Sequence, residues 1–220
     1  MKYCVIIPTY NNELTLDALI SGVLGHTRNV IIVNDGSTDE TAAVAVIHEA
    51  LHHAGLSEWP GEGTDTLNFS TTTTKSVVLD MGSTAAQTVN ANLVLSLSSG
   101  TGIEYVVGGS QGDTLTGNSL ANRLTGGPGN DALAGGAGND TYLFDADAAL
   151  GSDTIDETGG GVDTLDFAAT TGKSIAVNLS RTDAQVVNAN LTFRLLQSDT
   201  LEDVVGGGSS TLGDTLTGNG

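Results

Sequence analysis

The chain has 220 residues, with 26 acidic and 7 basic side chains and a formal net charge of −19. Such an acidic chain disfavours nucleic acids and anionic membrane surfaces as partners, because both require a basic surface, and it repels itself unless cations neutralise it. The 30 glycines, the 4% aromatic content and the single cysteine argue against a conventional large core and exclude an internal disulfide, and the longest apolar runs are too short to span a membrane.

Residues 1–57 predict a small α/β unit. The stretch "KYCVIIPTYNN" (2–12) is typical of an apolar strand that ends in a turn, and "ELTLDALISGVLGHT" (13–27) has apolar residues at helical spacing. Residues 29–55 predict a second strand, a turn and a second helix. Continuous apolar strands that alternate with helices indicate a parallel, buried sheet, so we expect a βαβα, Rossmann-like fragment.

Two motifs in this unit, "IIPTYNN" (6–12) and "VNDGSTDET" (33–41), resemble the opening of a family 2 glycosyltransferase of the GT-A type. The resemblance implies that these loops hold the nucleotide of a nucleotide-sugar donor at the carboxyl ends of the strands. It also implies that Pro8, Thr9 and Tyr10 line the base pocket, and that Asp35 hydrogen-bonds the base or the ribose.

The later parts of that family's pattern do not follow. A metal-binding DxD, an acceptor side and a catalytic base are expected after the nucleotide loops, and the resemblance ends at residue 55. Asp145 and Asp147 in "FDADAAL" (144–150) form a DxD, but that stretch is better interpreted as a strand and a turn. We therefore expect no turnover from this chain.

The stretch "HEALHHAGLSE" (48–58) contains an H-E-x-x-H motif. His48 and His52 on one helix face could share a zinc ion, with Glu49 as general base. The longer stretch resembles the metzincin pattern, with Glu58 at the third ligand position, and serralysin-like metzincins carry downstream repeats like those described below. The sheet before the zinc helix and the Met-turn are missing, so we favour a helix with exposed histidines over a zinc site.

From residue 58 onward the chain has no histidine and is rich in Gly, Thr, Asp and Asn. A repeat with an offset of 98 residues is present, since "GTDTLNF" (63–69) recurs as "GVDTLDF" (161–167) and "QTVNANLVLSL" (87–97) recurs as "QVVNANLTFRL" (185–195). Apolar residues alternate in both copies and predict half-buried strands. In the first copy they are Val89, Ala91, Leu93, Leu95 and Leu97. We assign the first copy to 58–107 and the second to 145–220, which ends in the start of another array.

A nine-residue period lies between the two copies, with units that begin at Gly108, Gly117, Gly126 and Gly135. The last two units, "GGPGNDALA" and "GGAGNDTYL", match GGxGxDxUx at every fixed position when Tyr142 counts as the apolar residue U. The first two are degenerate, with Gln111 in place of glycine and Asn122 in place of aspartate. These units resemble the RTX, or haemolysin-type, calcium-binding repeats of secreted bacterial proteins.

The resemblance implies a parallel β-roll over 108–144, in which two nonapeptides complete one turn and loops 18 residues apart share a side. Glycines permit positive φ, and Ca²⁺ takes six to eight oxygen ligands, so carbonyls and aspartates suit it. We expect one Ca²⁺ between loops 108–113 and 126–131, and a weaker one between loops 117–122 and 135–140. The candidate calcium ligands are Gly108, Gly109, Asp113, Asn122, Gly126, Gly127, Gly129, Asp131, Gly135, Gly136, Gly138 and Asp140.

Three functions remain open on the sequence alone. The first is calcium binding without catalysis, by a mainly β solenoid in a secreted, acidic bacterial protein. The second is a glycosyltransferase fragment that binds a nucleotide-sugar, and the third is the remnant of a zinc metalloprotease. We favour the first because its motifs account for most of the chain. An extracellular location follows from the resemblance and the charge, although "MKYCVIIPTYNN" does not predict a cleavable signal peptide.

Overall fold

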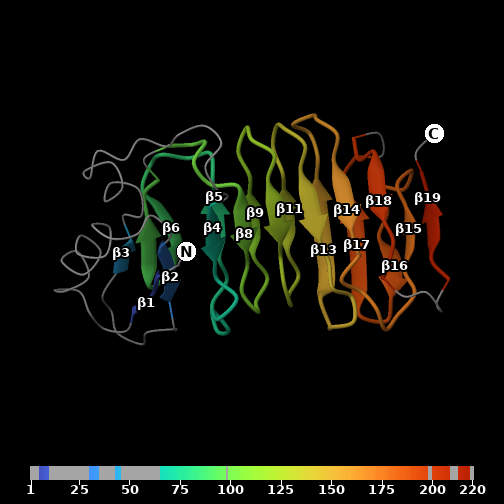
Figure 1. The fold of residues 1–220 in the computed structure, drawn as a ribbon, viewed down its shortest axis with the longest axis horizontal. Helices are drawn as coiled ribbons and strands as arrows, with labels where there is room; N and C mark the ends of the chain where they lie inside the picture. The colour runs from blue at the N-terminus through green and yellow to red at the C-terminus, as the bar shows by residue number, and fades with distance from the viewer. Residues whose placement is uncertain are drawn as a thin grey trace.

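The computed structural model describes residues 65–97, 99–197, 200–208 and 213–218 in full, and the backbone of three strands before them. Within these residues the structure contains strands and no helix, and so no helix there is long and apolar enough to cross a membrane. The strands stack along the long axis of the molecule in approximate chain order, as Figure 1 shows. The prediction of a mainly β solenoid with parallel pairing is confirmed.

Two six-stranded sheets run along the solenoid. Sheet 1 contains β4 (Thr66–Asn68), β8 (Tyr105–Val107), β10 (Arg123–Thr125), β12 (Thr141–Leu143), β14 (Thr164–Asp166) and β18 (Asp203–Val205). Sheet 2 contains β5 (Val78–Asp80), β9 (Thr114–Thr116), β11 (Ala132–Ala134), β13 (Gly151–Asp156), β17 (Leu191–Leu195) and β16 (Gln185–Asn188).

The chain alternates between the sheets from β8 to β14, so that each coil gives one strand to each sheet. Strands of successive coils pair in parallel, for example Leu133 with Leu115 in sheet 2 and Leu124 with Val106 in sheet 1. Most of these strands are three residues long, and the middle residue of each three-residue strand is buried. Two nonapeptides therefore complete one coil, as the resemblance to RTX repeats implies.

The core is a single stripe of apolar side chains between the two sheets. The four U residues of the nonapeptides are all buried, and they are Leu115, Leu124, Leu133 and Tyr142. At the C-terminal end of the array the rings of Phe144, Phe167 and Phe193 stack, with the closest centroids 5.1 Å apart. This aromatic stack joins the array to the second long copy, because Phe167 and Phe193 belong to that copy.

The 98-residue sequence repeat is also a structural repeat. In the first copy, β6 (Gln87–Asn90) and β7 (Leu93–Leu95) form an antiparallel hairpin with an irregular register after Thr88, and β16 and β17 repeat it with the same irregularity after Val186. The second copy also pairs β15 (Ala176–Asn178) with β19 (Thr215–Thr217), as the first pairs β5 with β9.

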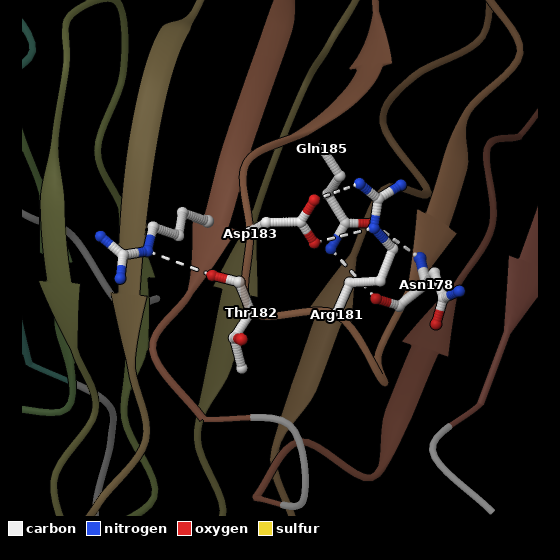
Figure 2. Close-up of polar contacts among 6 residues, drawn as sticks. Asn178, Arg181, Thr182, Asp183 and Gln185 are labelled. Atoms are coloured by element: carbon white, nitrogen blue, oxygen red, sulfur yellow. Dashed lines mark hydrogen bonds and ion pairs between the residues drawn. The ribbon is translucent and has the colours of Figure 1, made fainter.

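A glutamine closes the turn before each hairpin in both copies. The backbone N–H of Asn178 donates to Oε1 of Gln185 at 2.8 Å, and Nε2 of Gln185 donates back to the Asn178 carbonyl at 3.0 Å, as Figure 2 shows. Gln87 makes the same two bonds with Asp80 in the first copy. The ion pair between Arg181 and Asp183 in the same turn is exposed, and such pairs stabilise proteins little.

The alternating run expected in each long copy is interrupted by a turn. Ala91 and Ala189 are exposed at the hairpin tips, whereas the apolar residues after them are buried. The cause is an asparagine side chain, since Oδ1 of Asn90 accepts the N–H of Asn92, and Asn188 and Asn190 repeat this bond. Asparagine favours such local turns over an extended strand. The prediction that all five alternating residues share one face was therefore wrong at the alanine.

Three strands lie in the N-terminal segment. β1 (Val5–Thr9) pairs in parallel with β2 (Val30–Asn34), and β3 (Ala43–Ala45) pairs in parallel with β7 of the solenoid. The expected second helix covers β3, so the structure differs from the predicted βαβα order there. The open edge of β7 supplies backbone partners that a short Ala-Val-Ala segment can use as a strand. The first predicted helix lies outside the described residues.

Candidate metal centre

Three aspartates line one edge of the solenoid, and we call Asp113, Asp131 and Asp153 the first file. Each stands at the sixth position of a nonapeptide unit, directly before β9 for Asp113 and β11 for Asp131, and within β13 for Asp153. The backbone N–H of Asp113 donates to Oδ1 of Asp131 at 2.8 Å, and the N–H of Asp131 donates to Oδ1 of Asp153 at 3.0 Å. Each carboxylate therefore holds the backbone of the preceding coil through one oxygen.

The opposite edge carries the equivalent residues of sheet 1, and we call Asp65, Glu104, Asn122, Asp140, Asp163 and Glu202 the second file. The same pattern recurs, since the N–H of Asn122 donates to Oδ1 of Asp140 at 2.7 Å and the N–H of Asp140 donates to Oδ1 of Asp163 at 2.8 Å. The N–H of Asp163 donates in turn to Oε2 of Glu202. The two files lie on opposite sides of the roll.

Five members of these files escaped the sequence reasoning, namely Asp65, Glu104, Asp153, Asp163 and Glu202, and two of them lie in disguised nonapeptides. Asp153 lies in "AALGSDTID" (148–156) and Asp163 in "TGGGVDTLD" (158–166), which keep the fourth glycine and the sixth aspartate of the nonapeptide. The residues "FDAD" (144–147) and Glu157 interrupt the nine-residue spacing and hide the two units. The sequence feature that could have revealed these units is the glycine at their fourth position. Gly151 and Gly161 have positive φ, as Gly138 does in an intact unit.

Four buried carboxylate oxygens accept no hydrogen bond. They are Oδ2 of Asp131, Oδ2 of Asp140, Oε2 of Glu157 and Oδ2 of Asp163. Asp140, Glu157 and Asp163 are at most 1% exposed, and each contributes one oxygen to a group in which all atoms lie within 4.8 Å of one another. Buried acceptors without donors cost free energy, and crowded carboxylates add repulsion. A bound hard cation would remove both costs.

Four aspartates of the files, and Glu157 beside them, have a raised pKa and so hold their protons more tightly than exposed carboxyl groups. Burial raises the pKa of Asp131 and of Asp140 to about 6, and that of Asp153 to about 7. For Glu157, burial and then the charge of Asp163 raise the pKa to about 9. Burial also raises the pKa of Asp113, against the lowering effect of the backbone N–H groups that it accepts. A site that raises the pKa of carboxyl groups in this way also attracts a cation that can replace the proton.

Glycine is required beside these carboxylates. A Cβ at Gly126 would overlap Oδ2 of Asp131, and a Cβ at Gly135 would overlap Oδ2 of Asp140. At Gly127 the backbone has φ +94°, which side chains other than glycine rarely adopt. The loops therefore leave room around the unpaired oxygens where any other residue would fill it.

Both predicted loop pairs are adjacent in the structure. Loop 126–131 lies against loop 108–113, since the Cα of Gly127 faces the carbonyl of Gly109, and Gly136 faces the carbonyl of Asn118 in the other pair. In the first pair, Oδ2 of Asp113 accepts the N–H of Gly109, and Oδ2 of Asp131 is free.

Asn122 is engaged with the backbone around it. Its Oδ1 accepts the N–H of Asn118 at 2.7 Å, and its Nδ2 donates to the carbonyls of Ile103 and Glu104. One carboxylate oxygen of Asp140 is grouped with oxygens of Glu157 and Asp163, one coil further on.

The other candidate residues lie elsewhere. Pro8 and Thr9 are part of β1, of which the structure describes the backbone alone, and Tyr10, Asp35, His48, His52 and Glu58 lie outside the described residues. Asp147 of the DxD accepts the N–H groups of Thr171 and Gly172, which lowers its pKa and ties it to a turn of the solenoid.

Comparison with protein families finds two matches. The family described as RTX calcium-binding nonapeptide repeat matches residues 98–119, 107–142 and 116–155, and the family described as Glycosyl transferase family 2 matches residues 4–52. No curated protein matches the chain. Residues 98–155 are therefore RTX repeats, Ca²⁺ is the ion that such repeats bind, and they are preceded by a segment that resembles the start of a family 2 glycosyltransferase.

Proposed function

We propose that the RTX repeats hold Ca²⁺ between neighbouring coils along both files, and that the ions fasten the coils together in a secreted protein. The observation that carries the proposal is the set of buried carboxylate oxygens without a donor at Asp131, Asp140, Glu157 and Asp163. Each of them belongs to a side chain that is at most 2% exposed. A cation is the partner that such oxygens lack, and calcium prefers oxygen ligands.

In the first file the ion would lie between loops 108–113 and 126–131. Asp113 and Asp131 would supply the carboxylates, and main-chain oxygens of Gly108, Gly109, Gly126, Gly127 and Gly129 are the further candidates. Asp131 already holds its coil partner through Oδ1, so Oδ2 is free for the ion. Neutralising the buried charge would then stabilise the stacking of these two coils.

In the second file the expected ion between loops 117–122 and 135–140 would use Asn122 and Asp140, with main-chain oxygens of Gly135, Gly136 and Gly138. We propose that this site is the weaker one, because the amide of Asn122 is neutral and is engaged with the backbone. Asp140 contributes more strongly to the coil that follows, where two further carboxylates face it.

We further propose the division into an N-terminal α/β fragment (1–57), a first β copy (58–107), an RTX roll (108–144) and a second β copy (145–220). A secreted location suits weak calcium sites, since calcium is abundant outside cells and scarce in the cytosol. The carboxylate files have the character of a structural ion site, and we propose that this chain has no catalytic activity of its own.

Circular dichroism with and without millimolar calcium tests the proposal, because the roll would fold or tighten on binding. The β signal and the melting temperature should rise with calcium and return to their starting values with a chelator. Magnesium at the same concentration is the matched control, since it demands a small octahedral site and keeps its waters. Identical spectra and melting curves with and without calcium would refute the proposal.

A second candidate function is nucleotide-sugar binding by the N-terminal segment. It is favoured by the family match over residues 4–52, which includes both nucleotide-loop motifs. Calorimetry with a nucleotide-sugar tests it, and Asp35→Ala should abolish the heat of binding. The absence of heat from the unmodified chain would leave calcium binding as the one function supported.

A further inference from the structure

Glu157 occupies a loop position that the neighbouring coils give to glycine. Ala134 at the end of β11 pairs with Asp156 at the end of β13, so the residues that follow them, Gly135 and Glu157, occupy equivalent places in successive coils. The backbone N–H of Gly135 donates to Oε1 of Glu157 at 3.2 Å, and a Cβ on Gly135 would press on that same oxygen. The nonapeptide pattern places glycine first in the loop, so it assigns no side-chain ligand there.

We propose that Glu157 is an additional direct ligand, and that Asp140, Glu157 and Asp163 form a three-carboxylate cation centre that binds calcium more tightly than any other site in the described chain. This inference rests on the proposed function, because it assumes that the roll takes up calcium. It adds a ligand that the repeat motif does not contain.

The geometry supports one ion shared by the three side chains. Oδ1 of Asp140 and Oδ1 of Asp163 each accept a hydrogen bond from a backbone N–H, and Oε1 of Glu157 accepts one from Gly135. The second oxygen of each carboxylate is free, and all three side chains are at most 1% exposed. The group therefore brings three carboxylates close together, and backbone hydrogen bonds already orient each of them.

Charge distinguishes this centre from the other candidate sites. Three ionised carboxylates bring a charge of −3 to one ion, whereas Asp113 and Asp131 bring −2 and the pair of Asn122 and Asp140 brings −1. Within the described residues, no lysine or arginine pairs with Asp140, Glu157 or Asp163. Ligand charge is a main determinant of calcium affinity, so this centre should fill first as calcium is added.

The location gives the ion a specific structural role. Asp140 leads into β12, the last strand of the uninterrupted nonapeptides, and Asp163 leads into β14, which belongs to the second long copy. An ion between them would fasten the array to the second copy at the start of β12 and β14, and the stacked rings of Phe144 and Phe167 join the two at the other end of these strands. Filling this centre first would order the junction before the remaining coils take up calcium.

Tyr142 provides a spectroscopic reporter for this one centre. Its buried hydroxyl accepts the N–H of Gly135 at 2.6 Å, and that same N–H reaches Glu157. Terbium(III) is a hard, oxygen-seeking ion that replaces calcium, and it emits when a nearby excited tyrosine transfers energy to it. Tyrosine-sensitised terbium emission should therefore report occupancy of the centre.

The experiment titrates the purified full chain with Tb³⁺, and then with Ca²⁺ as a competitor. We expect one tight class of emitting ion that calcium displaces. Glu157→Gln keeps an oxygen for the Gly135 N–H but removes the charge, and it should weaken this class by at least the roughly 10- to 100-fold that follows loss of a partner around a metal site. Tyr142→Phe should lose the emission while calorimetry still finds the tight calcium class.

Two further measurements separate the possible failures. In the terbium titration, Asp131→Asn, in the first file, should keep the tight class of emitting ion. In thermal unfolding, Glu157→Gln should raise the melting temperature of the calcium-free protein, because it removes a buried carboxyl group that is crowded against two others. An unchanged tight class in Glu157→Gln would overturn the inference, while the proposed function would still stand. If the unmodified chain binds neither ion, the proposed function fails first.

Discussion

The backbone N–H of Asp140 donates to Oδ1 of Asp163 at 2.8 Å, across 23 residues of chain, and leaves Oδ2 of both residues buried without a partner. One oxygen of a carboxylate thus links two coils through a backbone N–H, and the other oxygen is buried and available to a cation. The same division recurs at Asp131 in the first file. The files therefore join successive coils of the solenoid and leave buried carboxylate oxygens that, in the proposed function, a cation fills.

The raised pKa values of the file aspartates and of Glu157 predict that the calcium-free protein loses stability as pH rises. The unfolded carboxyl groups titrate near about 4, whereas in the folded chain the pKa values are about 6 for Asp131, about 7 for Asp153 and about 9 for Glu157. The folded state therefore binds more protons. The stabilisation is complete below about pH 4 and is lost as pH rises through the folded pKa values, to about pH 9.

Urea unfolding in a chelator at several pH values between about 5 and 9 checks this slope. The exposed Asp147 and Asp183 have lowered pKa values, so they stay ionised in both states over this range and do not affect the slope. Saturating calcium should flatten or reverse the trend, because the ligands must be ionised to bind it. A calcium-free protein that becomes more stable toward alkaline pH would contradict the burial of these groups.

Leu133→Ala should destabilise the roll by about 2–5 kcal/mol, because the side chain is 1% exposed in the middle of the core stripe and its loss leaves a cavity. Val186→Ala is the control, since Val186 is 68% exposed and its truncation should cost less than about 0.5 kcal/mol. Thermal and urea unfolding in saturating calcium measure both changes. Equal effects from the two variants would show that the stripe is not the core.

Gly135→Ala should weaken calcium binding in the second file, because its Cβ would overlap Oδ2 of Asp140 and press on Oε1 of Glu157. Gly213→Ala is a matched control, since a Cβ there has no atom within 4 Å. Calcium calorimetry compares them, and we expect loss of affinity in the first variant alone. A Gly135→Ala protein with unchanged calcium affinity would mean that this loop can shift without disturbing the carboxylates.

Gln185→Ala should lower stability by roughly 1–3 kcal/mol, because two hydrogen bonds to the backbone of Asn178 are lost. Asp183→Ala in the same turn should change stability little, since its ion pair with Arg181 is exposed and is screened by water. Chemical unfolding of both variants distinguishes the turn closure from the surface charge. A larger loss of stability from Asp183→Ala than from Gln185→Ala would contradict this account of the turn.

Much of the roll could be predicted from local patterns. Leu115, Leu124, Leu133 and Tyr142 repeat every nine residues, and that spacing predicted their burial, while the resemblance to RTX repeats implied the parallel coils. The loop pairs around Asp113 and Asp131 followed from the same arithmetic. Strictly periodic segments are predictable because each unit meets the same neighbours.

The centre around Glu157 could not be predicted in this way. Asp163 is 23 residues from Asp140 instead of 18, because inserted residues lengthen the coil between them, and Glu157 stands where the motif has glycine. The ends of the hairpins were misjudged for a different reason, since the Asn90 side chain turns the chain at Ala91. Such features depend on contacts between distant segments or on a single side-chain bond, which periodicity does not report.

Calcium titration by calorimetry, on the unmodified chain and on Asp131→Asn and Asp140→Asn, is the most direct test of the claim that buried file carboxylates bind the ions. We predict heat of binding in the unmodified chain, loss of a weaker class in Asp131→Asn, and loss of the tight class in Asp140→Asn. Each exchange replaces one carboxylate oxygen by an amide nitrogen and keeps the other oxygen as an acceptor, so the backbone contacts of both coils can persist. Unchanged binding in both variants, or no heat from the unmodified chain, would contradict the account.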